Sequence, residues 1–438
     1  MPDMKLTRIA VLVACGSALT SCSDLTNIER TGIVQPAAQN NVTGAVAMYA
    51  GATQKFVTTT QNSILFSGLF SDELIDASGA SLVFGHLDAR RPQNSTNQTG
   101  QLLTEFSNAL VALRFAAGQL EQYAPTPGSR RGQMYSYEGY LETYLADQFC
   151  SGIPFSTIDF SGNVEYGAGT STVDTYGRAI AHFDSAMAVS ADSARVLNLA
   201  RVGKGRVLLN LGKYPEAAAA VAAVPTSFVY NLDINAAIVA QQNALYTTTT
   251  LQKRVAVPTG SDGINGINWA AAADPRVRVA PNGKGFDGVI DVYSYVPFSS
   301  TGAAVRIASG IEARLVEAEA ALQANNNDAA TTGTGWLGIL NTLRATAITP
   351  GLAPLADPGS YQARVNLLFR ERAFWLYLTS TRMADLRRLV RQYGRAQETV
   401  FPTGTYRDGQ PRGSEVNLIP PLLERPNTAY TGCIDRKA

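Results

Sequence analysis

The sequence predicts a mainly α-helical protein in which pairs of helices stack into one scaffold, interrupted by an insertion of loops and short strands. Two observations support this fold class. Apolar residues recur with the period of an amphipathic helix over long segments on both sides of the chain's middle. Residues 225–302 lack that period, are rich in Thr, Gly, Val, Asn and Pro, and contain short alternating runs such as residues 289–298 that suggest strands.

The composition is that of a globular protein with little net charge. The chain has 438 residues, of which 45% are hydrophobic and 16% charged, and its formal net charge is +1. The length allows a large core, and so balanced a charge gives no electrostatic basis for binding nucleic acid. Two histidines, His86 and His182, are too few for a His-based metal site. We therefore expect no metal, no cofactor and no nucleic acid.

The first 21 residues have the pattern of a lipoprotein signal peptide. Lys5 and Arg8 precede an apolar run over residues 9–20, which is too short to cross a bilayer. Small residues then lead to Cys22, as in the bacterial lipobox. We expect acylation of Cys22 to anchor the mature chain to a membrane without spanning it, with residues 22–40 as a polar tether. The alternative is an ordinary secretory peptide with an incidental cysteine.

Helical periodicity divides the mature chain into two helical parts around the insertion. The first part, residues 41–224, has helical patterns over 42–56, 101–123, 132–150, 175–189, 195–211 and 215–224. The second part, residues 303–438, has them over 305–324, 329–345 and 362–391. Asp192 and Ser193 are placed to cap the helix after them. The turn from Leu211 to Ala217 resembles that of a tetratricopeptide repeat, so we predict a tetratricopeptide-like helical-repeat scaffold.

Residues 362–391 are the segment around which we expect the fold to be organised. Apolar residues lie on two opposite sides of this predicted helix, whose one candidate kink is at residues 379–381, so it should be buried. Seven arginines and no lysine occur in it, and arginine tolerates burial because it pairs with carboxylates bidentately. We predict structural ion pairs among Arg372, Glu371, Arg382 and Asp385.

The four cysteines give one further prediction. Cys15 would leave with the signal peptide and Cys22 would be acylated, so Cys150 and Cys433 remain. In an exported protein these two either form a disulfide or stay as unpaired buried thiols, and we predict the disulfide.

The chain contains no recognisable catalytic pattern. Residues 333–338 fit the dinucleotide fingerprint G-x-G-x-x-G, with Asp357 downstream, but a polar run precedes them where a buried strand is required. Asp72, Glu73 and Asp76 could do acid–base chemistry, although three acids at a helix end are usually solvated or capping. We therefore predict no catalytic residues.

Aromatic and amide side chains of the insertion are candidates for binding a sugar. Sugars are recognised by aromatic faces that stack on their C–H surfaces, with amide and carboxylate hydrogen bonds beside them. The candidates in this sequence are Trp269, Tyr293, Tyr295, Asn268 and Tyr246. Trp269 leads them because it follows a Gly/Asn loop that could present its ring. The alternative for each aromatic is a place in the core of a small sheet.

Three segments together resemble those of one known family. Residues 305–320, 274–277 and 415–420 resemble family motifs, and a longer signature lies in residues 371–388. Its matching residues are Glu371, Arg372, Leu376, Arg382, Asp385, Leu386, Arg387 and Arg388. This pattern resembles the C-terminal signature of the SusD/RagB family of surface glycan-binding lipoproteins. The family's Glu-Gly-His is replaced here by Thr379, Ser380 and Thr381, so the usual glycine turn is missing.

The resemblance implies an outer-membrane lipoprotein, lipid-anchored and facing the cell exterior. Such a protein binds a nutrient, usually an oligosaccharide and in some relatives a peptide, and delivers it to a SusC-like TonB-dependent transporter without catalysis. Two other functions remain open from the sequence. One is a glycan-cleaving enzyme on helix pairs that uses Asp72 or Glu73, and the other is a protein-binding repeat scaffold.

Overall fold

The computed structural model describes residues 40–79, 84–91, 97–158, 163–260, 263–324, 335–420, 427–430 and 432–438. The predicted signal peptide, Cys22 and Gly333 lie outside these residues. Within the described parts of the chain, no helix is both long and apolar enough to cross a membrane.

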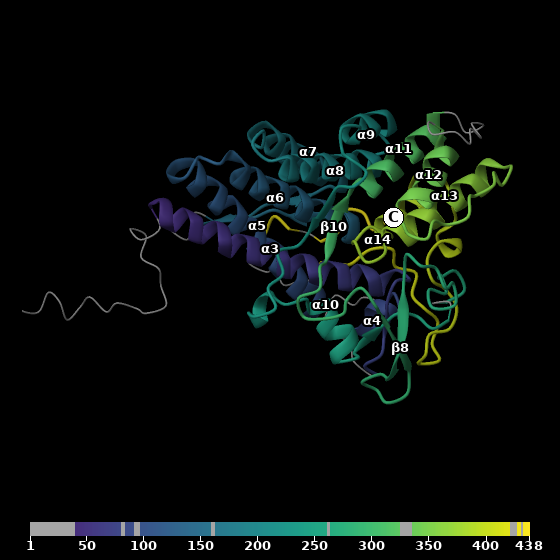
Figure 1. Cartoon of the computed structure of the whole chain (residues 1–438). Coiled ribbons are helices and arrows are strands. Elements are labelled where there is room, and N and C mark those ends of the chain that lie inside the picture. Colours follow the sequence, from purple (N-terminus) through teal and green to yellow (C-terminus); the bar gives the residue numbers. More distant parts are fainter. Residues whose placement is uncertain are drawn as a thin grey trace, which may run out of the picture.

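Successive helices pack on one another and form a continuous stack (Figure 1). Its members are α3 (Val42–Phe70), α5 (Asn97–Tyr123), α6 (Gly128–Gln148), α7 (Thr172–Val189), α8 (Ala194–Asn210), α9 (Tyr214–Val221), α11 (Gly310–Ala324), α12 (Trp336–Thr346), α13 (Tyr361–Trp375) and α14 (Arg382–Arg391). Each of α3, α5, α6, α7 and α8 contacts the next helix of the stack, α9 then contacts α11, and α11 contacts both α12 and α13. The predicted mainly α, tetratricopeptide-like scaffold is confirmed.

Glycines allow the close approach of α6, α7 and α8. The ring of Phe183 on α7 is fully buried between Gly139 of α6 and Gly203 of α8. A Cβ atom at Gly139 would lie 2.8 Å from that ring, and one at Gly203 would lie 2.4 Å from it. These distances are too short for any side chain, so the two glycines set the spacing of three helices.

Side-chain caps define where the helices begin. Ser171 accepts a hydrogen bond from the Asp174 N–H at 3.1 Å at the start of α7, and Ser193 accepts one from the Val196 N–H at 3.4 Å at the start of α8. The predicted cap at Ser193 is therefore present. Asp192 has another role, because its carboxylate accepts from the Ser129 N–H at 3.0 Å.

The insertion attaches to the helical stack through short antiparallel strand pairs. Its strands β6 (Val229–Asn231) and β7 (Val255–Ala256) pair with β10 (Arg306–Ser309) and β1 (Ile75–Asp76), and β8 (Val279–Lys284) pairs with β9 (Asp291–Tyr295). In Figure 1, β8 and the short helix α10 (Ala244–Tyr246) lie across α3 from α7 and α9. The suggested strand run 289–298 contains β9.

Short elements complete the described chain. They are α4 (Phe84–Asp88), β2 (Ile153–Pro154), β3 (Thr157–Ile158), β4 (Val164–Glu165), β5 (Gly169–Thr170), η1 (Val239–Gln241), η2 (Thr247–Leu251) and η3 (Gln397–Thr399).

The C-terminal tail is fastened to the end of α6. Cys150 and Cys433 form the predicted disulfide across a sequence separation of 283 residues. Beside it, the Cys150 N–H donates to the Leu418 carbonyl at 2.9 Å, and the Ser151 N–H donates to the Asp435 carbonyl at 3.0 Å. The last residues of the chain thus belong to the folded body.

Residues 362–391 form two helices rather than the single helix that we predicted. The chain leaves α13 at Trp375, turns through residues 376–381 and begins α14 at Arg382. Leu378 (φ 52°) and Ser380 (φ 63°) take the left-handed conformation that glycine normally supplies. Surrounding contacts hold them there: Leu378 N–H donates to the Glu73 carboxylate at 2.9 Å, and Gln148 donates to the Ser380 hydroxyl at 2.8 Å.

Candidate functional site: a cleft lined by aromatic rings and arginines

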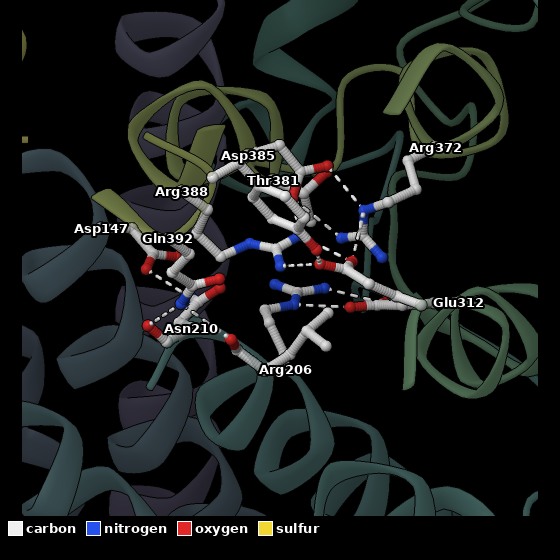
Figure 2. Close-up of polar contacts among 12 residues, drawn as sticks. Asp147, Arg206, Asn210, Glu312, Arg372, Thr381, Asp385, Arg388 and Gln392 are labelled. Carbon is white, nitrogen blue, oxygen red and sulfur yellow. Dashed lines mark hydrogen bonds and ion pairs between the residues drawn. The ribbon is translucent and has the colours of Figure 1, made fainter. Parts of the chain in front are cut away.

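Most charged side chains of α13 and α14 are committed to buried ion pairs. Figure 2 shows Arg372 and Arg388 both pointing toward Asp385. Arg372 donates to both oxygens of Asp385 at 2.8 and 2.9 Å, and Arg388 donates to it at 2.8 Å. Arg388 also binds Glu319 on α11 at 3.0 Å. Asp385 is buried, as predicted, and pairs with Arg372, another member of the predicted group.

The other two predicted members of this group have different partners. Arg382 donates to Asp72 at 2.6 and 2.8 Å, and Glu371 accepts from Arg276 at 2.6 Å and from Arg344 at 2.8 Å. The spacing of Arg382 and Asp385 along one helix suggested that they pair. The turn before α14 instead directs Asp385 toward α13, and Arg382 reaches the end of α3.

Electrostatics explain why Asp385 remains ionised inside the protein. Burial would raise the pKa of this carboxyl, but Arg372 and Arg388 beside it hold the pKa below its usual value. A second buried pair, Arg206 with Glu312 at 2.6 and 2.8 Å, lies next to this group in Figure 2. Buried charges that are paired this completely are structural.

The acids that might have catalysed a reaction are also buried. Asp72 and Glu73 are each 1% exposed, and Asp72 is occupied by Arg382 and by the Ile267 N–H at 2.9 Å. Burial raises the pKa of Glu73 to about 8. The expectation that these acids are solvated or capping is therefore wrong: Asp72 is an ion-pair partner across the core, and Glu73 supports the turn at Leu378.

A cleft of about 510 Å³ opens between the insertion and the end of α13. Its wall combines several aromatic rings with guanidinium groups. The described residues that line it include five aromatic residues, Tyr295, Phe298, Phe374, Trp375 and Tyr377, and three arginines, Arg276, Arg278 and Arg306. Leu378, one of the two strained turn residues, is also part of the wall.

The aromatic wall is built from two separate parts of the chain. β9 ends at Tyr295, whose ring packs edge-on against Phe298 and Tyr377, with 5.1 Å between ring centroids in each case. Phe374, Trp375 and Tyr377 follow one another at the end of α13 and are almost fully buried. Tyr295 keeps part of its surface exposed, so its ring is the one that a ligand can reach.

The three arginines of the cleft differ in how their charges are used. Arg276 binds Asp274 and Glu371, both at 2.6 Å, and its guanidinium lies 5.0 Å from the ring centroids of Phe374 and Trp375. Arg306 donates to the Trp375 carbonyl at 2.7 Å.

Arg278 is exposed, and its side chain has no hydrogen bond or ion pair to any residue that the structure describes. Trp375 also lines the cleft, and its Nε1 is buried without a partner among the described residues.

Trp269 lies in the core and not in the cleft. None of its surface is exposed, its Nε1 donates to the Asp72 carbonyl, and its ring packs 5.1 Å from Phe374 and 4.7 Å from Tyr377. The prediction that Trp269 presents its ring to a ligand is therefore wrong. The Gly/Asn loop turns this indole inward, where Asp72 and the end of α13 supply its partners.

Of the five candidate ligand residues, the structure brings only Tyr295 into the cleft. Asn268 accepts from the Ala271 N–H at 3.0 Å and so stabilises a local turn. Tyr293 and Tyr246 are half-buried and pack against the core. The alternative of core packing fits these two residues better.

Sequence reasoning missed Arg278, Arg306, Trp375 and Tyr377 as lining residues. Two signals could have found them. Arg278 is two residues after the Asp-Pro-Arg motif, and Trp375 and Tyr377 are the last aromatic residues before the substituted Glu-Gly-His position.

Comparison with known proteins identifies the fold. No family profile and no curated protein matches the chain. A SusD superfamily protein from Bacteroides thetaiotaomicron superposes with a TM-score of 0.65 at 13% identity, covering 90% of this chain and 99% of its own. A SusD-like protein from Bacteroides fragilis gives 0.64 at 12% identity, over 92% and 99%. This chain has the SusD fold.

The two superpositions cover nine tenths or more of this chain. A laminarin-binding SusD-like protein also matches, with a TM-score of 0.55, 14% identity and coverage of 90% of this chain and 99% of that one. At such low identity the likeness defines the fold, and the ligand of this SusD-fold chain has to be argued from its own residues. Among those described, no group of three or more His, Cys, Asp and Glu side chains is arranged to hold a metal ion.

Proposed function

We propose that this protein is a surface lipoprotein that binds an oligosaccharide in the cleft beside Tyr295 without changing it. The observation that carries the proposal is the combination of an accessible aromatic ring with guanidinium donors in one concave site. Sugars are bound by such sites because ring faces pack on C–H surfaces while charged donors bind hydroxyl groups.

Other cavities of the described structure lack an accessible ring beside arginines. The cavity of about 360 Å³ that is lined by Arg387 and Arg391 has one ring, that of Tyr176, which is only 2% exposed. A cavity of about 480 Å³ beside α11 and α12 is lined by no aromatic residue. One of about 540 Å³ beside α9 and α11 has a single ring, that of Tyr214, among mostly aliphatic residues. The cleft at Tyr295 is therefore the better candidate for a sugar.

The positions of the acids favour binding over hydrolysis. Glycoside cleavage normally needs two carboxyl groups on either side of the scissile bond. The described residues that line the cleft include no Asp or Glu, and Asp72 and Glu73 are buried away from solvent. An enzyme that uses Asp72 or Glu73 is thus the weaker alternative.

The fold supports a role in nutrient uptake. Among the matched structures, one is described as laminarin-binding and another, from Bacteroides vulgatus, as a SusD-like carbohydrate binding protein. By this likeness and the resemblance of the sequence motifs, the proposed role includes anchoring in the outer membrane through Cys22, facing the cell exterior, and delivery of the glycan to a SusC-like TonB-dependent transporter.

The cleft is tested by titrating the soluble mature chain, without Cys22, with a panel of plant and microbial oligosaccharides. Tyr295→Ala should weaken binding by about 1–3 kcal/mol, the contribution of one aromatic anchor. Tyr166→Ala is the matched control, because Tyr166 is 46% exposed and lies outside the cleft. Equal affinities of both variants would exclude the cleft, and peptide binding with no glycan binding would overturn the proposed ligand class.

The anchor is tested separately in cells. Cys22→Ala should release the protein from the outer membrane, because acyl chains supply the anchoring energy. Membrane fractionation and incorporation of a labelled fatty acid measure this. A variant that stays in the membrane and a wild type without label would contradict anchoring at Cys22.

A further inference from the structure

The charged residues that line the cleft at Tyr295 are all positive. Three arginines are among the described residues that line it, and no acid is. The whole chain carries a formal net charge of only +1. The excess in the cleft is therefore local and does not reflect a basic protein.

Arg276 does not contribute to this excess. Asp274 and Glu371 both bind its guanidinium, and Glu371 also accepts from Arg344. Arg276 is 4% exposed, so its charge is neutralised inside the wall. Its contact with Glu371 holds the segment before β8, which carries Arg278, against α13.

Arg278 and Arg306 remain without an acidic partner. Neither forms an ion pair with a residue that the structure describes, although Arg306 donates to the Trp375 carbonyl. Both line the same cleft as the partly exposed Tyr295. Burial raises the pKa of the Tyr295 hydroxyl, and the positive charges of Arg306 and Arg278 oppose that rise, as expected for charges close to this residue.

From this arrangement we infer that the ligand is an acidic oligosaccharide, whose carboxylate or sulfate group lies between Arg278 and Arg306 while the sugar ring packs on Tyr295. The inference rests on the proposed function, because it names the class of glycan that the cleft takes. A guanidinium matches carboxylate and sulfate oxygens with two parallel N–H donors.

A neutral sugar fits the cleft less well. Its hydroxyl groups would replace water on Arg278 and Arg306 without compensating either charge, and removing an unpaired charge from water is unfavourable. An anion compensates both charges.

The experiment compares pairs of oligosaccharides that differ only in charge. Galacturonate oligomers are titrated against their methyl esters, and sulfated galactan oligomers against their desulfated forms, so that the two sources of negative charge are measured separately. We expect at least one charged member to bind about tenfold or more tighter than its neutral partner, as hydrogen bonds to charged groups predict. The preference should decrease as ionic strength rises.

Substitutions of Arg278 and Arg306 test whether these two residues cause the preference for charged oligosaccharides. Arg278→Gln and Arg306→Gln should each remove most of it, and their melting temperatures show whether they fold. Arg278 is exposed and has no partner among the described residues, so Arg278→Gln keeps the test decisive if Arg306→Gln unfolds. Arg195→Gln on α8 is the control, because it removes the same charge from a 48% exposed position outside the cleft.

The outcomes separate this inference from the proposed function. Equal binding of charged and neutral partners overturns the acidic ligand. A preference that survives Arg278→Gln overturns the placement of the acidic group between Arg278 and Arg306. Both results leave glycan binding intact. Absence of binding by every oligosaccharide, or binding of acidic peptides alone, overturns both.

Discussion

Arginines on the two sides of the α13–α14 turn illustrate two uses of one side chain. On the packed side, Arg372 and Arg388 are almost fully buried and share Asp385. On the cleft side, Arg278 and Arg306 lie beside aromatic rings with no carboxylate. The residue type is therefore uninformative by itself, and the presence or absence of an acid within reach separates a structural charge from one available to a ligand.

The largest loss of stability should come from disrupting the buried ion pairs on the packed side. Asp385→Ala leaves Arg372 and Arg388 without their shared partner, at a cost of about 3–5 kcal/mol in the free energy of unfolding. Denaturant titration measures this loss. The control is Asp184→Ala, which removes an ion pair with Lys204 whose acid is 48% exposed and should cost no more than about 1 kcal/mol.

If Asp385→Ala and Asp184→Ala lose similar amounts of unfolding free energy, the buried ion pairs contribute no more to stability than an ion pair at the surface. Asp385→Ala should leave the contacts of the cleft unchanged, so any variant protein that remains folded should bind its ligand as the wild type does.

A smaller effect, of opposite sign, is expected at Glu73, which supports the turn between the two sides. Burial raises its pKa from 4.5 to about 8, so the folded chain holds a proton that the unfolded chain releases. The stabilisation from that proton is fully present below pH 4.5 and is lost as the pH rises toward 8. Glu73→Gln should therefore be more stable than the wild type at pH 8, by roughly 2–4 kcal/mol.

Unfolding free energies at pH 5 and pH 8 test this prediction. The advantage of Glu73→Gln should be much smaller at pH 5, where the wild-type side chain is also protonated. Parallel pH profiles for the two proteins would show that Glu73 is ionised in the folded state.

The smallest effect should be that of the Tyr295 hydroxyl. Tyr295→Phe keeps the ring and removes one hydrogen-bonding group, so it should weaken ligand binding by about 0.5–1.5 kcal/mol. Calorimetry beside Tyr295→Ala separates the two contributions. A loss as large as that of the alanine variant would mean that the hydroxyl, and not the ring face, provides the affinity.

The scaffold could be predicted from the sequence because its helices are long and periodic. Ser193 and the Leu211–Ala217 turn are local signals, and the structure places a cap and a helix connection there. The break between α13 and α14 was not predictable as a full turn, because the residues that adopt positive φ are Leu378 and Ser380 rather than glycines. Contacts from Glu73 and Gln148, far away in sequence, hold them in that conformation.

The site was harder to predict because a loop does not reveal the direction of its side chains. Trp269 and Tyr295 both belong to non-helical, aromatic-containing sequence, yet one is fully buried and the other lines a cleft. Trp269 can be buried because the core contains an acceptor for its N–H: the indole donates to the carbonyl of Asp72. Arg278 was missed because its distinguishing property is the absence of an acidic neighbour, which only the folded chain reveals.

The pairing of Asp72 with Arg382 spans 310 residues and therefore affects how the protein is made. At typical synthesis rates, about 15 to 60 seconds pass between the appearance of the acid and that of its partner. Until then the first helices contain a carboxylate without a counter-charge. Because burying it alone is unfavourable, the N-terminal half should not complete its packing before Arg382 is available. A chain that stops before Arg382 would lack this pair and should be less stable than the full-length protein.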